Sequence, residues 1–196
     1  MAQTVFVTGA SGFIAKHIIV KLLIAGFDVI GSVRKIERES EVHAAVAPHV
    51  DGDIADRLRC VALDLGNDAG WDEALQGADV LMHTASPFPR TQPKNEEDII
   101  RPAVDGTLRA LRAAKAAGIT RVILTSSSVA VTNTDLPADR RTYTEDDWTD
   151  INHPAATPYV KSKTLAEKAA WDYIRDEAPE VALTVINPVF VLGTPL

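Results

Sequence analysis

Short apolar runs alternate along the chain with longer stretches in which apolar residues recur at helical spacing. The apolar runs are continuous rather than alternating, which is typical of strands that are covered on both faces. Strands separated by helices predict right-handed crossovers and therefore a doubly wound parallel sheet of the α/β class. The expected strands are Thr4–Thr8, Val29–Val33, Arg59–Leu63, Val80–Thr84, Arg121–Thr125 and Ala182–Ile186. The expected helices are Phe13–Ala25, Glu39–Ala47, Trp71–Gln76, Glu96–Ala117 and Tyr159–Glu177.

Three glycines support this division, because Gly26, Gly77 and Gly118 each follow a helical run just before a strand. A left-handed C-terminal cap is expected at such positions. Residues 133–158 have no clear period and are rich in Asp, Thr and Pro, and the segment is long for a structureless connection. We expect this segment to form a loop over a functional site, with Trp148 holding it to the core.

The length of 196 residues suits one substantial core, so we expect a single domain over residues 1–196. The net charge of −7 and the lack of a basic run argue against nucleic acid as a partner. Cys60 is the only cysteine, which excludes an internal disulfide, fits a reducing compartment and suggests a small apolar strand residue. No secretory signal is visible, and residues 13–30 are too polar to span a bilayer, so the cytoplasm is the expected location.

A glycine-rich turn joins the first expected strand to the first helix and reads Thr8-Gly9-Ala10-Ser11-Gly12-Phe13-Ile14-Ala15. Gly9 permits a tight turn, Gly12 allows backbone amides to approach an anion, and Ala15 is small enough for close helix–strand packing. The start of the helix then offers unpaired N–H groups to a pyrophosphate. We therefore expect a dinucleotide here, with contacts from Gly9, Ser11, Gly12, Phe13 and Ile14. The alternative is a tight turn without a ligand.

The end of the second strand bears on which dinucleotide binds, because an acidic residue about 20 positions after the glycines would hold a ribose 2′-hydroxyl. No carboxylate stands there; the segment contains Ser32, Arg34 and Lys35. Arg34 offers a planar fork that suits a phosphate, and Ser32 can add a hydroxyl. The segment favours NADP(H), with NAD(H) possible, unless Arg34 and Lys35 are only solvated loop charges.

Two further strand ends place candidate groups at the carboxyl edge of the sheet, where open sheets bind ligands. After the third strand, the Asp64 carboxylate and the Leu65 side chain could meet an adenine edge. After the fourth strand come the small residues Thr84, Ala85 and Ser86. His83 precedes them, and we expect it to be structural, because no metal-ligand cluster accompanies it in the sequence.

The proposed chemistry rests on hydroxyls after the fifth strand and on a Tyr–Lys pair. Thr125 leads into the serines Ser126, Ser127 and Ser128, and a serine there could stabilise charge on a substrate oxygen. Tyr159 is the only tyrosine with a lysine four residues on, at Lys163, and such positions share one helix face. We expect this cation to lower the pKa of the phenol toward neutrality and make it a tunable proton donor.

In this order, the motifs resemble those of the extended short-chain dehydrogenases/reductases, and most closely the branch of dihydroflavonol reductases, cinnamoyl-CoA reductases and NADPH-dependent aldehyde reductases. The resemblance covers essentially the whole chain. It rests on Thr8–Ala15, Asp64-Leu65, His83–Pro87, Thr125–Ser127 and Tyr159–Lys163. It implies a Rossmann-type fold and hydride transfer between NADP(H) and an aldehyde, ketone or alcohol, without a metal.

The resemblance also assigns roles to particular residues. It implies that Ser127 is the catalytic serine, with Ser126 as the fallback. It also implies that Tyr159 is the acid/base, that Lys163 is its partner lysine, and that both contact the cofactor. It implies that Pro188 and Val189, after Asn187, reach the nicotinamide, and that Arg34 stands where NADP-preferring members carry an arginine.

Three features depart from the pattern of those relatives. Ala15 replaces a third glycine, and Ala103 stands where many relatives carry an asparagine that relays protons. The relatives also continue well past Asn187-Pro188 into a smaller substrate domain. We therefore expect that domain to be largely missing from residues 1–196, and the substrate to remain unnamed.

Two other functions remain open. A nucleotide-sugar epimerase or dehydratase would usually show Tyr-Gly after the serines and an acid after the second strand, whereas this chain has Val129 and Ser32 there. A non-catalytic NADP-binding regulatory module is the second alternative. The expected partner is a small carbonyl or alcohol substrate, and the chain is expected to be a monomer or a homodimer, paired if at all through alanine-rich faces of its two long helices.

Overall fold

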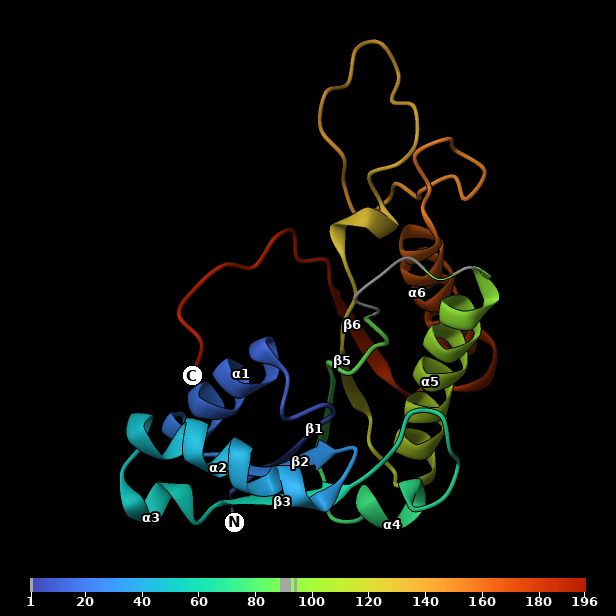
Figure 1. Ribbon diagram of the computed structural model, residues 1–196. Coiled ribbons are helices and arrows are strands. Elements are labelled where there is room, and N and C mark those ends of the chain that lie inside the picture. Colours follow the sequence, from blue (N-terminus) through green and yellow to red (C-terminus); the bar gives the residue numbers. More distant parts are fainter. Residues whose placement is uncertain (1, 89–92, 94) are drawn as a thin grey trace.

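A six-stranded parallel sheet forms the centre of the computed structural model, which describes residues 2–88, 93 and 95–196 (Figure 1). The strand order is β3-β2-β1-β4-β5-β6, and every neighbouring pair is parallel. The order reverses between β1 and β4, which opens a crevice at their carboxyl ends. The strands are β1 (Thr4–Val7), β2 (Asp28–Val33), β3 (Leu58–Ala62), β4 (Val80–His83), β5 (Arg121–Thr125) and β6 (Ala182–Ile186). This topology confirms the predicted doubly wound Rossmann fold.

Helices cover both faces of this sheet. One face carries α1 (Phe13–Ile24) and α2 (Glu39–Val46), with the short α3 (Gly52–Ala55) beside α1; the other carries α4 (Trp71–Ala74), α5 (Glu97–Ala116) and α6 (Pro158–Glu177) (Figure 1). The predicted helices agree with these bounds to within a few residues. Four short elements were not predicted, because they are too short to show a helical period: α3 and the single 3₁₀ turns η1 (Ile36–Arg38), η2 (Ala47–His49) and η3 (Ser128–Ala130).

Alternate residues of β1 enter two separate apolar cores. Phe6 packs with residues of α5 and α6, whereas Val5 and Val7 pack with α1 and α2, and all three are buried. This agrees with the expectation that the strands are covered on both faces. The expectation is wrong for β6, because β6 lies at the edge of the sheet and its residues Ala182 and Ile186 are exposed.

The alanine-rich faces of α5 and α6 lie against each other within the chain. Ala110, Ala113 and Ala114 of α5 and Ala170 of α6 are buried in the same core. These faces are therefore used inside the fold, which is the alternative to pairing with a second copy; whether the chain is a monomer or a homodimer stays open. Within the described part of the chain, no helix combines the length and the apolar character that crossing a membrane requires.

Residues 131–157 form a long connection without helix or strand between η3 and α6, as predicted. The anchor of this loop was predicted wrongly. Trp148 stays partly exposed and lies under the Lys168 ammonium, 5.1 Å from the ring centre. The buried residue is its neighbour Thr149, which donates a 2.6 Å hydrogen bond from its hydroxyl to the Val129 carbonyl.

Candidate active site

The glycine turn after β1 has the geometry that close backbone approach requires. Gly9 has a φ of +68°, and a Cβ there would lie 3.0 Å from the Ala85 Cβ, so only glycine fits without displacing its neighbour. The Gly12 N–H donates to the Gly9 carbonyl over 2.8 Å, and α1 begins at the next residue. The turn therefore places the first residues of α1 at the crevice between β1 and β4, where the strand order reverses.

A cleft of about 450 Å³ lies at this turn and brings many of the predicted cofactor residues together. Its lining includes Gly9, Ser11, Gly12, Ser32, Arg34, Lys35, Leu65, Thr84, Ala85 and Ser86. Ser32 is buried, and its hydroxyl accepts a 3.1 Å hydrogen bond from the Gly9 N–H, so it also holds the turn. Arg34 and Lys35 are exposed at the rim and give this end of the cleft positive charge.

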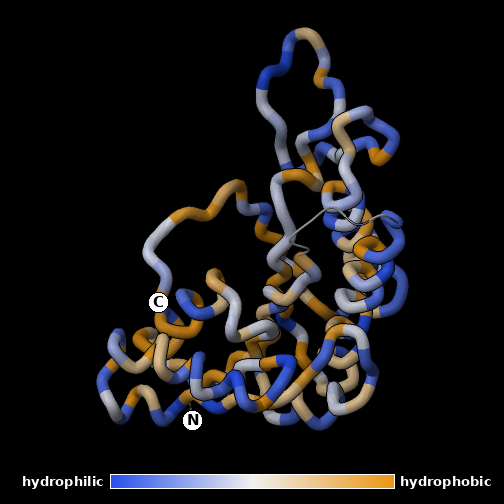
Figure 2. The backbone as a smooth tube through the Cα atoms, viewed as in Figure 1, coloured by the Kyte–Doolittle hydropathy of each residue, from blue (hydrophilic) through white to orange (hydrophobic). Residues whose placement is uncertain are grey.

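Some other residues predicted to contact the cofactor do not line this cleft, and their contacts with a cofactor stay predictions. Asp64 does not line the cleft, because its carboxylate accepts a 2.8 Å hydrogen bond from the Gly66 N–H in its own exposed turn. Phe13 and Ile14 line a different, apolar groove between α1 and the final segment of the chain. Val189 of that final segment is exposed, within the hydrophobic stretch that follows β6 in Figure 2.

Thr8, at the end of β1, connects the glycine turn to the end of β4. Its hydroxyl oxygen lies 2.9 Å from the His83 Nδ1 and accepts hydrogen bonds of 3.0 Å from the Thr84 and Ala85 N–H groups. His83 is buried, and this burial, followed by the nearby Lys163 cation, lowers its pKa to about 3. The imidazole is therefore neutral at ordinary pH, which fits a structural role.

The serine run after β5 is held against the segment that follows β6. The Ser126 N–H donates to the Ile186 carbonyl over 2.8 Å, and the Ser128 N–H donates to the Pro188 carbonyl over 3.0 Å. The Ser127 hydroxyl accepts a 3.4 Å hydrogen bond from the Val129 N–H at the start of η3. Among the described residues, the buried Ser126 hydroxyl has no hydrogen-bond partner, so it remains available to a ligand.

Tyr159 lies in the first turn of α6, which Thr157 caps by accepting a 3.4 Å hydrogen bond from the Val160 N–H. The Tyr159 ring meets the Phe88 ring edge to face, with 5.5 Å between the centroids. Burial raises the pKa of Tyr159, while a side-chain hydrogen bond with Ser127 acts in the opposite direction. The two hydroxyls predicted to act together therefore lie side by side.

The expectation that Lys163 lowers the pKa of Tyr159 is wrong for the protein by itself. Burial dominates and favours the neutral phenol. Burial also lowers the pKa of Lys163 to about 8, although the Glu167 carboxylate opposes this effect. Burial thus disfavours the charged form of both groups.

Glu167 is a residue of this region that the sequence analysis missed. It is buried on α6, one helical turn beyond Lys163, and accepts a 2.8 Å hydrogen bond from the side-chain amide of Asn187. The same amide donates to the Ser127 carbonyl over 3.1 Å. The repeated spacing of four residues from Tyr159 to Lys163 to Glu167 was a signal that could have identified it.

Arg38 of η1 was also missed, although it lines the cleft and belongs to the same basic segment as Arg34. Its guanidinium donates a 2.8 Å hydrogen bond to Glu41. A run of cations after the second strand could have pointed to it.

Comparisons with known proteins agree with this geometry. The model of a family described as NAD dependent epimerase/dehydratase matches residues 5–194. A putative NADPH-dependent methylglyoxal reductase of Candida albicans is 38% identical over 98% of this chain, and tetraketide alpha-pyrone reductase 1 of Arabidopsis thaliana is 37% identical over 98%. The chain spans 59% and 58% of the lengths of these two relatives.

A solved structure gives the same picture. Gre2 of Candida albicans, in complex with NADPH, is 35% identical over 98% of this chain and superposes with a TM-score of 0.84, and the match covers 59% of that protein. The sheet order, the glycine turn and these matches lead to one conclusion. This chain belongs to the NAD-dependent epimerase/dehydratase family, the extended short-chain dehydrogenases/reductases, where it is similar to the reductase branch.

Proposed function

We propose that this chain supplies the cofactor-binding and proton-donating parts of an NADP(H)-dependent carbonyl reductase that acts on an aldehyde or a ketone. The observation that carries the proposal is the hydrogen bond between Tyr159 and Ser127, with the buried Lys163 one helical turn after Tyr159 on α6. The relatives support it, since the Candida albicans protein is named as an NADPH-dependent reductase and Gre2 is solved with NADPH.

The residues of the cleft fit a phosphorylated dinucleotide. The crowded Gly9 position and the start of α1 suit a pyrophosphate, and Arg34 and Lys35 suit an additional phosphate on the adenosine ribose. The unpartnered Ser126 hydroxyl and Thr125, at the end of β5, suit the nicotinamide end of the dinucleotide. In this proposal Pro188 and Val189 border that end, because Pro188 is hydrogen-bonded to Ser128.

The cofactor would supply a hydride to the carbonyl carbon. Ser127 donates a hydrogen bond to the carbonyl oxygen and stabilises the charge that develops there. Tyr159 transfers its phenolic proton to the same oxygen, and its raised pKa keeps that proton available at neutral pH. Lys163, with a pKa of about 8, is cationic at neutral pH and stabilises the phenolate left behind.

A nucleotide-sugar epimerase or dehydratase is the alternative within the family. The basic end of β2, with Ser32 and Arg34 at the cleft, favours the reductase, because a carboxylate is usual there in the alternative. Val129, which follows the serines inside η3, also departs from the Tyr-Gly pattern of those enzymes.

The proposal is tested with the 196-residue chain in two steps. Fluorescence titration should detect saturable NADPH binding, and a panel of aldehydes and ketones should then oxidise NADPH, followed by absorbance. Binding without oxidation of NADPH, also in a longer chain that includes a C-terminal substrate domain, would favour the non-catalytic NADP-binding module. Failure to bind NADPH would reject the reductase and the regulatory module together.

A further inference from the structure

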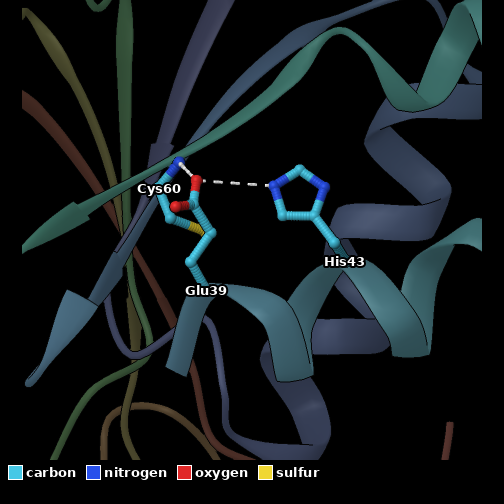
Figure 3. Close-up of side chains that lie close together, drawn as sticks. All are labelled: Glu39, His43 and Cys60. Carbon is cyan, nitrogen blue, oxygen red and sulfur yellow. Dashed lines mark hydrogen bonds and ion pairs between the residues drawn. The ribbon is translucent and has the colours of Figure 1, made fainter. Parts of the chain in front are cut away.

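A second cluster of polar side chains lies on the opposite side of β2 from the proposed catalytic groups. Glu39 and His43 occupy the first and second turns of α2, four residues apart, and Cys60 lies in the middle of β3 (Figure 3). One ligand atom from each residue lies within 4.8 Å of the other two. All three side chains are partly buried, so the cluster is sheltered but open to solvent.

The fold brings these groups together for a clear reason. β3 is an edge strand of the sheet, and α2 packs beside it. The Cys60 N–H donates a 3.3 Å hydrogen bond to the Glu39 carboxylate, which lies 3.6 Å from the His43 Nε2 (Figure 3). A structural explanation exists for this pair, since Glu39 caps the strand edge and forms a helical ion pair with His43. Neither contact requires the Cys60 thiol to lie beside them.

We propose that Glu39, His43 and Cys60 bind a zinc-like divalent cation, with solvent in the fourth position. Thiolate, imidazole and carboxylate are the ligands that Zn²⁺ takes at bond lengths of about 2.0–2.3 Å, which places neighbouring ligand atoms roughly 3.3–3.7 Å apart. The 3.6 Å gap between Glu39 and His43 already falls in this range. The Cys60 sulfur lies within 4.8 Å of both ligand atoms, so its distance to each has to shorten by at most roughly 1.5 Å.

Binding would replace a proton on sulfur with the metal. Burial, followed by the charge of Glu39, raises the pKa of Cys60 to about 11, so the metal-free protein carries a thiol here. The cation displaces this proton into solvent, and no oxidant or reductant is needed. The bound ion would fasten α2 to β3, directly after the η1 turn that contributes Arg38 to the cleft.

Isothermal titration calorimetry with ZnCl₂ on the chelator-treated chain tests this site. One saturable Zn²⁺ is expected, with no comparable binding of MgCl₂, because a thiolate and an imidazole favour the softer ion. His43→Gln and Cys60→Ser should each weaken Zn²⁺ binding at least tenfold. His49→Gln is the matched control, since His49 is exposed near the end of the same helix, and it should leave the affinity unchanged.

A spectroscopic measurement guards against variants that fail to fold. Co²⁺ added to the unaltered chain should give a thiolate-to-metal charge-transfer band, because Cys60 is the only cysteine. The proposal is overturned if Zn²⁺ does not saturate a single site, if His43→Gln and Cys60→Ser both lose less than tenfold, or if Co²⁺ binds without this band. Circular dichroism of each variant checks that the fold is intact.

Discussion

The side-chain amide of Asn187 donates a 2.8 Å hydrogen bond to the buried carboxylate of Glu167, and through this contact the segment after β6 is attached to α6. The same amide donates to the Ser127 carbonyl. One helix, one strand end and the last segment are therefore joined at a single buried group. Glu167 holds the proposed catalytic groups in position and need not touch the substrate itself.

Replacing Glu167 should test this positioning role. Glu167→Ala leaves the Asn187 amide without its acceptor and should lower the free energy of unfolding by about 1–3 kcal/mol. Displacing Ser127 and Lys163 should also lower kcat roughly tenfold or more, with a smaller effect on KM. Urea denaturation and NADPH oxidation measure the two effects. Glu167→Gln keeps an acceptor oxygen and should recover most of both, so equal defects in the two variants would contradict the role.

Tyr159→Phe should reduce the rate of NADPH oxidation by about 10²- to 10⁴-fold, because the carbonyl oxygen loses its positioned proton donor. NADPH binding should persist, as measured by fluorescence titration. Tyr143→Phe is the matched control: the Tyr143 hydroxyl donates to the Thr134 carbonyl within the long loop, away from Ser127. An unchanged rate in Tyr159→Phe would remove the phenol from the mechanism.

Arg34→Ala should raise the Kd for NADPH by about 10- to 100-fold, since a charge-assisted hydrogen bond contributes about 1.5–3 kcal/mol. The Kd for NADH should change little, because NADH lacks the additional phosphate. Competitive titrations of both cofactors measure the ratio. Arg141→Ala, an exposed arginine in the long loop, should leave both values unchanged. Equal losses for the two cofactors in Arg34→Ala would contradict the assignment of phosphate to Arg34.

Acid should destabilise the protein through His83. Its folded pKa of about 3 lies below the ordinary histidine pKa of 6.5, so between these values the unfolded chain binds a proton that the folded chain does not. Stability is therefore lost as the pH falls from about 6.5 toward 3, and His83 should account for about 2 kcal/mol between pH 7 and pH 5.

Urea denaturation at pH 5, 6 and 7 measures this loss. His83→Gln should flatten the pH dependence by the same amount, whatever its effect at neutral pH. His49→Gln, at an exposed position, should retain the slope of the unaltered chain. A slope in His83→Gln equal to that of the unaltered chain would show that His83 does not set it.

The fold could be predicted from the sequence because the pattern that indicates each helix, strand or turn lies within that element. The apolar run of Val80–Met82, the helical period of Tyr159–Glu177 and the glycine at Gly118 each report the backbone state of their own segment. The glycine turn could be predicted for the same reason. Gly9 has a positive φ, and a side chain there would collide with Ala85, so the position requires glycine.

The errors arose where a group's partner is distant in sequence or where burial decides. Trp148 was expected in the core, where its neighbour Thr149 lies instead. The pKa of Tyr159 was expected to fall because of Lys163, yet it rises because the phenol is withdrawn from water.

The order of elements, the parallel sheet and the residue types at the carboxyl edge of the strands follow from the amino-acid sequence, because hydrophobic period and turn chemistry act over a few residues. Which of those groups meet depends on how the helices pack on the sheet. Glu167 and Asn187 are hydrogen-bonded although they lie 20 positions apart, and Cys60 and Glu39 although they lie 21 apart. The burial that shifts the pKa values of Tyr159 and Lys163 exists only once the helices have packed on the sheet.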